Sequence, residues 1–396
     1  MEGKLKHPKT TAFVLLLSAF MCSADTMTLQ PILELLSTDV FPDAGYAKVS
    51  MIMNASAIAL ALISIATATL TKFGKKKLLL IGSILFAVGG LSGALVTNIN
   101  YIIFTRIFEG LGAGLVMTVS LMQIPELFQD QATVDKLMGY NGIMMAVFSG
   151  LITFTSGYMA LVNWKLPFLY YAVGFIIFIL QWIFIPADNK SGAEENQPVV
   201  KSHASKAGIL HALGGFGFGL VTSFFFVCIS GVVAENGIGN ASVAGTAATF
   251  NTVGSFISGF LFAAIFGKLK DYSFPCFYLC MILAFMGIIK ATTAPTVFAL
   301  AVLNGFGWNW FFSAYLAKVS MISDGSSLDA NMAWANGAFY IGQFMTPFAL
   351  SAIVSATGNE SVVFALKCAM VAMIILAVIH LIVAISGSSK KKNAVQ

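Results

Sequence analysis

The sequence predicts an all-α polytopic membrane protein with twelve transmembrane helices in two six-helix bundles. The chain has 396 residues, of which 58% are hydrophobic and 10% are charged. This composition is too apolar for the surface of a water-soluble protein of this length. The apolar residues form about twelve blocks of roughly 20 to 28 residues, and as helices these blocks are long enough to cross a hydrocarbon core of about 30 Å.

The predicted helices follow the apolar blocks in chain order. They span residues 11–36, 46–71, 78–97, 101–122, 137–161, 167–186, 207–234, 242–266, 272–294, 296–321, 331–356 and 362–386. The stretch 187–206 is the only long polar one, and it divides the blocks six and six. We therefore expect an N-terminal bundle over 1–186, a flexible cytoplasmic linker over 187–206 and a C-terminal bundle over 207–396.

The lysines predict the orientation of these helices, because cytoplasmic loops of membrane proteins are enriched in Lys and Arg. If the N-terminus is cytoplasmic, seventeen lysines lie on the cytoplasmic side: Lys4, Lys6, Lys9, Lys72, Lys75, Lys76, Lys77, Lys136, Lys190, Lys201, Lys206, Lys268, Lys270, Lys318, Lys390, Lys391 and Lys392. Four lie outside: Lys48, Lys165, Lys290 and Lys367. This asymmetry predicts that both termini are cytoplasmic.

Two short motifs recur in the second half of the chain. Phe73-Gly74-Lys75 returns as Phe266-Gly267-Lys268, an offset of 193 residues (266 − 73). Gly110-Leu111-Gly112 returns as Gly305-Phe306-Gly307, an offset of 195 residues (305 − 110). Together with the equal helix counts, these offsets indicate a duplicated six-helix unit.

The chain resembles the major facilitator superfamily along its whole length. Asp25-Thr26 followed by Pro31 is similar to a first-helix motif of the proton-coupled drug and small-molecule exporters in that superfamily. The run from Lys72 to Lys77 resembles the basic loop after the second helix, and Arg106 to Gly110 with Gly112 resembles a fourth-helix motif. The resemblance implies secondary active transport by alternating access between two bundles, with Asp25 and Arg106 in proton coupling.

The sequence departs from the family pattern at several positions. Thr71 stands where the basic loop motif usually has Asp, and Thr67 where it has Gly. In the fifth block Gly142, Ala146 and Gly150 keep the small residues of the antiporter signature, whereas Val147 replaces its Pro. These departures leave the direction of transport open.

Arg106 is the single arginine of the chain and lies inside a predicted membrane helix. An unpaired charge there costs at least about 3 kcal/mol, so a partner is required. Counting residues from the outer helix ends places Asp25 and Arg106 at similar depths, and Glu109 follows Arg106 by one turn. We expect an Asp25–Arg106 pair or water-bridged network that couples transport to a proton. The alternative is a permanent ion pair that only joins two helices, and for Glu109 the two roles are evenly weighted.

The C-terminal half has uncharged polar and aromatic residues at helical spacing instead. These faces suit a cavity for an amphipathic or aromatic molecule, because rings supply contact area and amides fix orientation. The alternative is lipid contact or packing, yet amides avoid lipid. The candidate substrate-binding residues are Asn251, Asn304, Trp308, Asn336, Tyr340 and Gln343.

Other motifs indicate no catalysis. The sequence has no G-x-x-x-x-G-K-S/T phosphate loop, its five cysteines lie singly or one turn apart in apolar blocks, and His211 and His380 are interpreted as structural. We therefore expect no enzyme activity, cofactor, metal or nucleic-acid partner. The favoured function is proton-coupled export of a small organic molecule by a monomer in the plasma (inner) membrane. The alternative is proton-coupled or exchange-type uptake of an organic anion, in which Arg106 binds the substrate carboxylate.

Overall fold

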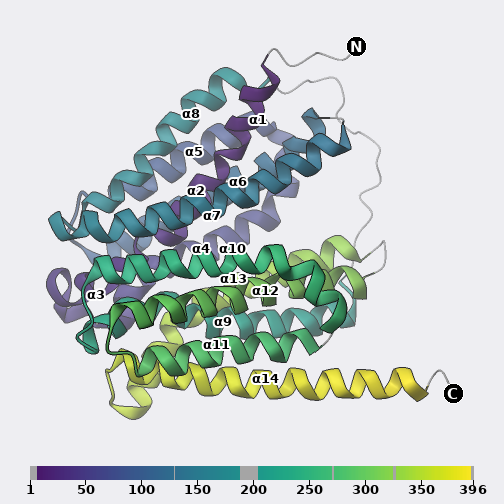
Figure 1. Ribbon diagram of the computed structural model, residues 1–396. Coiled ribbons are helices and arrows are strands. Elements are labelled where there is room, and N and C mark those ends of the chain that lie inside the picture. The colour runs from purple at the N-terminus through teal and green to yellow at the C-terminus, as the bar shows by residue number, and fades with distance from the viewer. Residues whose placement is uncertain (1–6, 129, 188–203, 270–271, 324–326, 394–396) are drawn as a thin grey trace. The chain divides into compact units, whose positions relative to one another are not determined.

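The computed structural model describes residues 7–128, 130–187, 204–269, 272–323 and 327–393 (Figure 1). The chain divides into two compact units, Met1–Lys201 and Ser202–Gln396, and each is described here by itself. Helices build both units, and the described ranges contain no β-strand. Most of the predicted linker 187–206 lies outside the described residues.

The first unit contains six predicted apolar blocks, each of which is a helix or a run of helical segments. Its elements are α1 (Pro8–Leu16), α2 (Ser18–Met27), η1 (Gln30–Ile32), α3 (Leu33–Leu35), η2 (Leu36–Val40), η3 (Pro42–Ala44), α4 (Tyr46–Leu70), η4 (Thr71–Phe73), α5 (Lys75–Ser92), α6 (Ile99–Leu127), α7 (Gln131–Val162), η5 (Leu166–Ala172) and α8 (Val173–Phe184). The predicted starts and ends agree with these bounds to within several residues.

The first block is not the single regular helix predicted over 11–36. Its helix α2 ends at Met27, a 3-10 turn contains Pro31, and a π-helical turn continues to Val40. Proline has no N–H to donate and its ring clashes with the preceding turn, so Pro31 disfavours a regular helix at this point. The break leaves carbonyl groups in the last turn of α2 available to other partners.

The second unit consists of six long helices. They are α9 (Lys206–Glu235), α10 (Ala241–Leu269), α11 (Ser273–Ile289), α12 (Ala294–Ile322), α13 (Leu328–Thr357) and α14 (Val362–Asn393). In Figure 1, α14 runs alongside α11, and the two pack extensively. The N-cap Ser205 accepts a hydrogen bond from the Gly208 amide and fixes the start of α9.

Both units have the same order of helix packing. In the first, α2 packs on α7, α4 on α6, and α5 on both α6 and α8. In the second, α9 packs on α13, α10 on α12, and α11 on both α12 and α14. If the helical blocks of each unit are numbered from one to six, both units pair the first block with the fifth and the second with the fourth. In both units the third block also packs on the fourth and the sixth. The shared pattern supports the internal duplication predicted from the sequence.

The repeated glycine motif lies at equivalent helix contacts in the two units. A methyl group at Gly110 would meet the backbone oxygen of Ser56 on α4, and one at Gly305 would meet that of Asn251 on α10. The offset is 195 residues for both partners (305 − 110 and 251 − 56). Glycine permits this close approach of two helix backbones, which explains why the motif occurs in both halves.

The chain is a multi-pass membrane protein. In the described ranges, nine helical segments are long and apolar enough to cross a membrane, and α11 is apolar but has only 17 residues. The segment Val362–Ser386 of α14 has the highest mean hydropathy, 2.9, and the smallest buried share, 17%. This combination is typical of a helix that faces lipid. The count of twelve spans and the cytoplasmic position of both termini stay predictions.

Candidate functional site: a buried charge cluster in the first unit

Arg106 lies at the centre of a buried polar cluster formed by four elements of the first unit. It projects from α6 and is 1% exposed. Its Nε donates to the carbonyl oxygen of Ile52 on α4 at 3.0 Å, and its Nη1 donates to the Tyr171 hydroxyl of η5 at 2.6 Å. Its Nη2 donates to the backbone oxygen of Asp25 at 2.6 Å and to Asp25 Oδ1 at 3.1 Å.

Glu109 completes the set of Arg106 partners. Its Oε2 lies 3.0 Å from Arg106 Nη1, one turn further along the same helix. A guanidinium has five N–H donors. Five acceptor contacts surround it here, four of them hydrogen bonds and the fifth this ion pair. Each of the three guanidinium nitrogens therefore donates at least one hydrogen bond within its own unit.

The break in the first block explains how Arg106 reaches Asp25. Asp25 lies in the last turn of α2, where carbonyl oxygens have no intrahelical partner. Arg106 supplies a donor to one of these oxygens and places a positive charge at the negative end of the helix dipole. Ser156 on α7 supplies another donor, to the carbonyl oxygen of Thr28. The sequence Asp25-Thr26 followed by Pro31 thus creates an acceptor site that an arginine fills.

The two carboxyl groups have acceptor capacity that no protein donor fills. Asp25 is 1% exposed and Glu109 0% exposed. In the described part of the chain, no donor hydrogen-bonds to Asp25 Oδ2 or to either carboxyl oxygen of Glu109. Two ionised carboxylates and one guanidinium sum to a charge of −1, and a single proton makes the cluster neutral.

The structure therefore brings together Asp25, Arg106 and Glu109, the three residues predicted for proton coupling. The Asp25–Arg106 pair that the sequence predicted is present, and the roles of the three residues in coupling stay a prediction. Sequence reasoning missed Tyr171, which contacts Arg106 through its hydroxyl and lies with its ring centroid 5.2 Å from the guanidinium carbon. A tyrosine at the start of the sixth block carries no local signal of this contact.

In the second unit, Asn304 and Asn251 bond to each other. Asn304 Nδ2 donates to Asn251 Oδ1 at 2.9 Å, and the two residues are 2% and 3% exposed. They join α12 to α10 at the contact that contains Gly305. Both had been predicted to line a substrate cavity. The structure places them in helix packing, which the sequence pattern did not distinguish from a cavity face.

Trp308 lies among aromatic side chains rather than amides. Its ring stacks on Phe312 with centroids 5.6 Å apart, and Phe218, Phe226 and Phe339 lie at 6.2 to 6.4 Å. Its indole Nε1 is buried, and no described residue accepts a hydrogen bond from it. A buried indole N–H usually has an acceptor, so this donor is available to a ligand.

The predicted residues of α13 lie close to this aromatic group or on the same helix. Tyr340 contacts Phe339 edge-on with ring centroids 5.4 Å apart. Asn336 donates to the carbonyl oxygen of Met332 on its own helix at 3.0 Å. Gln343 is half-buried and follows Tyr340 by about one turn. Of the six candidates, Trp308 and Tyr340 thus share the neighbour Phe339, whereas Asn251 and Asn304 belong to the α10–α12 contact.

His211 and His380 lie in the aromatic packing of the second unit. His211 stacks on Tyr315 with ring centroids 4.5 Å apart, and its Nε2 lies 3.0 Å from the Tyr315 carbonyl oxygen. His380 packs against Phe274 and Tyr278 at 5.4 and 5.5 Å. These contacts agree with the structural interpretation of both residues.

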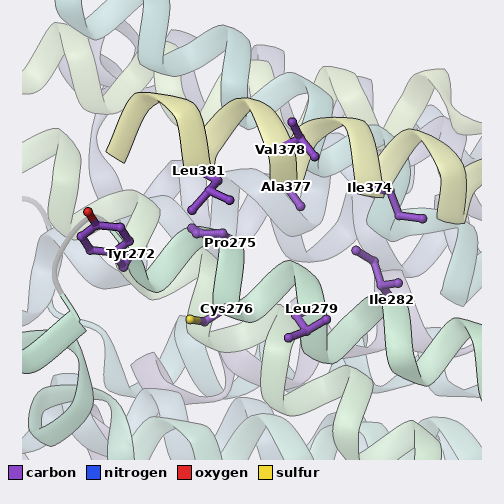
Figure 2. Close-up of a pocket in the computed structure, with 9 residues that line it drawn as sticks. All are labelled: Tyr272, Pro275, Cys276, Leu279, Ile282, Ile374, Ala377, Val378 and Leu381. Atoms are coloured by element: carbon purple, nitrogen blue, oxygen red, sulfur yellow. The ribbon is translucent and has the colours of Figure 1, made fainter. Parts of the chain in front are cut away.

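A separate groove lies between α11 and α14. Its volume is about 330 Å³, and its lining is apolar. Figure 2 shows the side chains around it, which come from α11, from α14 and from Tyr272 just before α11. Its residues are Tyr272, Pro275, Cys276, Leu279, Ile282, Ile374, Ala377, Val378 and Leu381. Leu279 and Val378 are about half exposed, as expected for side chains that face lipid. The groove presents no polar group to orient a polar substrate, so it is not the candidate transport site.

The basic run after α4 is tied to other elements of the first unit. Lys75 forms an ion pair with Glu126 near the end of α6. Lys76 donates to the carbonyl oxygens of Trp182 and Ile185 at 2.8 and 2.6 Å. These carbonyls are at the C-terminal end of α8, where helices favour a cation. The run therefore fastens α5 to its neighbours, and its cytoplasmic position stays a prediction.

Comparison with known proteins identifies the family. Residues 15–234 match the family described as Major Facilitator Superfamily. The chain belongs to this superfamily. Its members are transporters and not enzymes, and this chain is accordingly a membrane transporter. A protein named MFS-type transporter from Aspergillus terreus (strain NIH 2624 / FGSC A1156) is 32% identical over 94 residues, which are 24% of this chain and 17% of that protein.

Three solved structures are similar in fold to this chain over nearly its whole length. A mutant of the nucleoside transporter NupG has a TM-score of 0.79 at 8% identity, over 94% of this chain and 99% of that one. A D-xylose-proton symporter has a TM-score of 0.73 at 14% identity, over 95% and 97%. An inward-facing bacterial homologue of the human lysosomal transporter Spinster has a TM-score of 0.72 at 12% identity, over 96% of each chain. At these identities the likeness shows the fold.

Proposed function

We propose that this chain is a proton-coupled secondary transporter that exports a small organic molecule across the plasma membrane. The observation that carries the proposal is the buried cluster of two carboxyl groups on one guanidinium. Its charge changes from −1 to 0 when one proton binds, and burial makes that difference large in free energy. A conformational change that opens the cluster to water would release the proton, which is the requirement for coupling.

Transport in this proposal follows the alternating-access scheme of the superfamily. The N-terminal bundle 1–186 carries the proton on Asp25 or Glu109, with Arg106 as the counter-charge. The C-terminal bundle 207–396 binds substrate, with Trp308 and Tyr340 as the principal contacts and Asn336 and Gln343 as further polar groups. The linker 187–206 and both termini are cytoplasmic, and the chain acts as a monomer.

The engagement of Arg106 favours this proposal over uptake of an organic anion. A substrate carboxylate would need free guanidinium donors, and each of the three nitrogens of Arg106 already donates a hydrogen bond within its unit. An anion would have to compete with Asp25 and Glu109 for the positive charge. Export rather than uptake rests on the resemblance of Asp25-Thr26 and Pro31 to the exporter motif.

The test is proton movement in proteoliposomes that contain the purified chain and a pH-sensitive dye. A panel of aromatic drugs, nucleosides, sugars, amino acids and organic acids is added in turn. Proton movement opposite to the substrate supports coupled export, and movement with the substrate shows symport instead. Glu109→Gln and Asp25→Asn identify the carboxyl group that carries the proton. Substrate transport without proton movement for every compound would contradict the proposal.

A further inference from the structure

Tyr171 contacts the charge cluster in two ways. It lies on the 3-10 segment η5, is 0% exposed, and receives a hydrogen bond from Arg106 Nη1 at 2.6 Å. Its ring centroid also lies 5.2 Å from the guanidinium carbon, within the range of a cation–π contact. The same Arg106 nitrogen faces Glu109 Oε2 at 3.0 Å. Tyr171 and Glu109 thus share one nitrogen of the arginine.

The position of Tyr171 is fixed by its surroundings. A methyl group at Gly90 on α5 would overlap the Tyr171 ring, so glycine at this position makes room for the ring. Phe86 and Phe168 contact the ring with centroids 5.3 and 6.1 Å away. The adjacent Gly89 lets α5 approach the backbone of Glu109 in the same way. One glycine pair of α5 therefore sets the positions of both groups that share Arg106 Nη1.

We infer that Tyr171 is a positioning residue of the proposed proton-coupling cluster, which holds Arg106 Nη1 between its own hydroxyl and Glu109 and so limits the donors that reach the Glu109 carboxyl group. The inference rests on the proposed function. Nη1 has two N–H donors, and the hydroxyl of Tyr171 occupies one of them. Without that acceptor, the planar guanidinium can shift as a whole so that the released N–H faces Glu109. An additional donor stabilises the ionised carboxylate, so the cluster would release its proton at lower pH.

The side chains that face the cluster come from α2, α6 and η5. Cys22 and Asp25 come from α2, Arg106 and Glu109 from α6, and Tyr171 from η5. From α4 the contact is the backbone carbonyl of Ile52, and from α5 it is the glycine pair. Asp25 and Glu109 are the carboxyl groups among them, so a change in the pH dependence of coupling reports on these two.

The decisive experiment compares Tyr171→Phe with Tyr170→Phe in proteoliposomes. Tyr170 is the matched control, because it lies on the same segment and its hydroxyl contacts Thr155 of α7, away from the cluster. Two rates are measured over a pH series: proton-driven transport, and substrate counterflow, which requires no net proton movement. We expect the pH midpoint of proton-driven transport to fall by about one unit in Tyr171→Phe. Counterflow should stay within about twofold of the wild type, and Tyr170→Phe should match the wild type in both rates.

A second variant separates the hydroxyl acceptor from the ring. Tyr171→Gln keeps a carbonyl oxygen that can accept from Arg106 Nη1, so its pH midpoint should stay near that of the wild type. An acid shift in Tyr171→Gln, or a Tyr171→Phe profile that coincides with the wild type, would overturn the inference while leaving the proposed function intact. If the wild type itself moves no protons, the proposed function fails and the inference fails with it. If Tyr171→Phe does not fold, the Tyr171→Gln profile still decides between acceptor and packing.

Discussion

Replacing Arg106 by lysine is expected to destabilise the first unit strongly although the positive charge is kept. The guanidinium makes five acceptor contacts, whereas an ammonium group has three N–H donors. Four of these contacts are hydrogen bonds, so at least one is lost (4 − 3). Each hydrogen bond that involves a charged group contributes about 1.5 to 3 kcal/mol, so the expected loss in the free energy of unfolding is at least about 1.5 to 3 kcal/mol.

This magnitude is large relative to the whole stability of a protein, which is commonly about 5 to 15 kcal/mol. The assay is thermal unfolding of the detergent-purified protein, followed by tryptophan fluorescence or by aggregation-sensitive size exclusion. The matched control is Lys290→Arg, a reverse exchange at the exposed C-terminal end of α11. The control should unfold at the wild-type temperature. An Arg106→Lys variant as stable as the wild type would refute the assignment of the five contacts.

A double-mutant cycle tests whether Glu109 shares the same arginine. In the Arg106→Lys background, Glu109→Gln removes one carboxylate, and the ammonium then has to neutralise Asp25 alone. The two changes should be less than additive, with a coupling energy of about 0.5 to 3 kcal/mol. Simple additivity of the two losses would show that Glu109 gains nothing from Arg106, against the 3.0 Å contact.

Three further outcomes are expected. Asp25→Asn should abolish proton-driven transport and retain substrate counterflow, because the amide keeps the size of the side chain and fixes it neutral; pH-driven transport at the wild-type rate would leave Glu109 as the proton carrier. Trp308→Ala should weaken substrate binding about tenfold or more with normal expression, because a ring and a free indole donor are removed; unchanged affinity would assign Trp308 to packing. Reporters inserted within 190–205 and after Lys392 should both be cytoplasmic, and either one found outside would overturn the predicted twelve spans.

The sequence predicts the helical membrane fold well because hydropathy is a property of whole blocks. Every helix of the second unit overlaps one predicted block, and the polar stretch 187–206 contains the boundary between the two compact units. The first block was predicted less well. A hydropathy average is insensitive to one proline, so it does not show that α2 ends at Met27 and that a π turn extends to Val40.

The charge cluster could be predicted in part for a related reason. A single arginine inside an apolar helix requires a partner, and few carboxyl groups are at a suitable depth, so Asp25 and Glu109 follow from chain position alone. Tyr171 could not be found in this way, because a neutral side chain has no requirement that the sequence reveals. The Asn251–Asn304 pair shows a different limit of the sequence. Amides on apolar helices indicate burial, but a buried amide can form its hydrogen bond with another amide as readily as with a ligand.

The duplicated architecture shows why the charge cluster is confined to one unit. The 195-residue offset that relates Gly110 to Gly305 also relates Arg106 to Ala301 and Glu109 to Asn304. In the second unit the arginine is absent, and the residue in place of Glu109 is an amide that bonds across to α10. A carboxylate there would have no guanidinium partner, and an isolated buried charge is far costlier than an amide pair. Two units with the same helix packing therefore differ in chemistry at one equivalent contact: the first places a carboxyl group beside a guanidinium, and the second joins α10 to α12 through an uncharged amide pair.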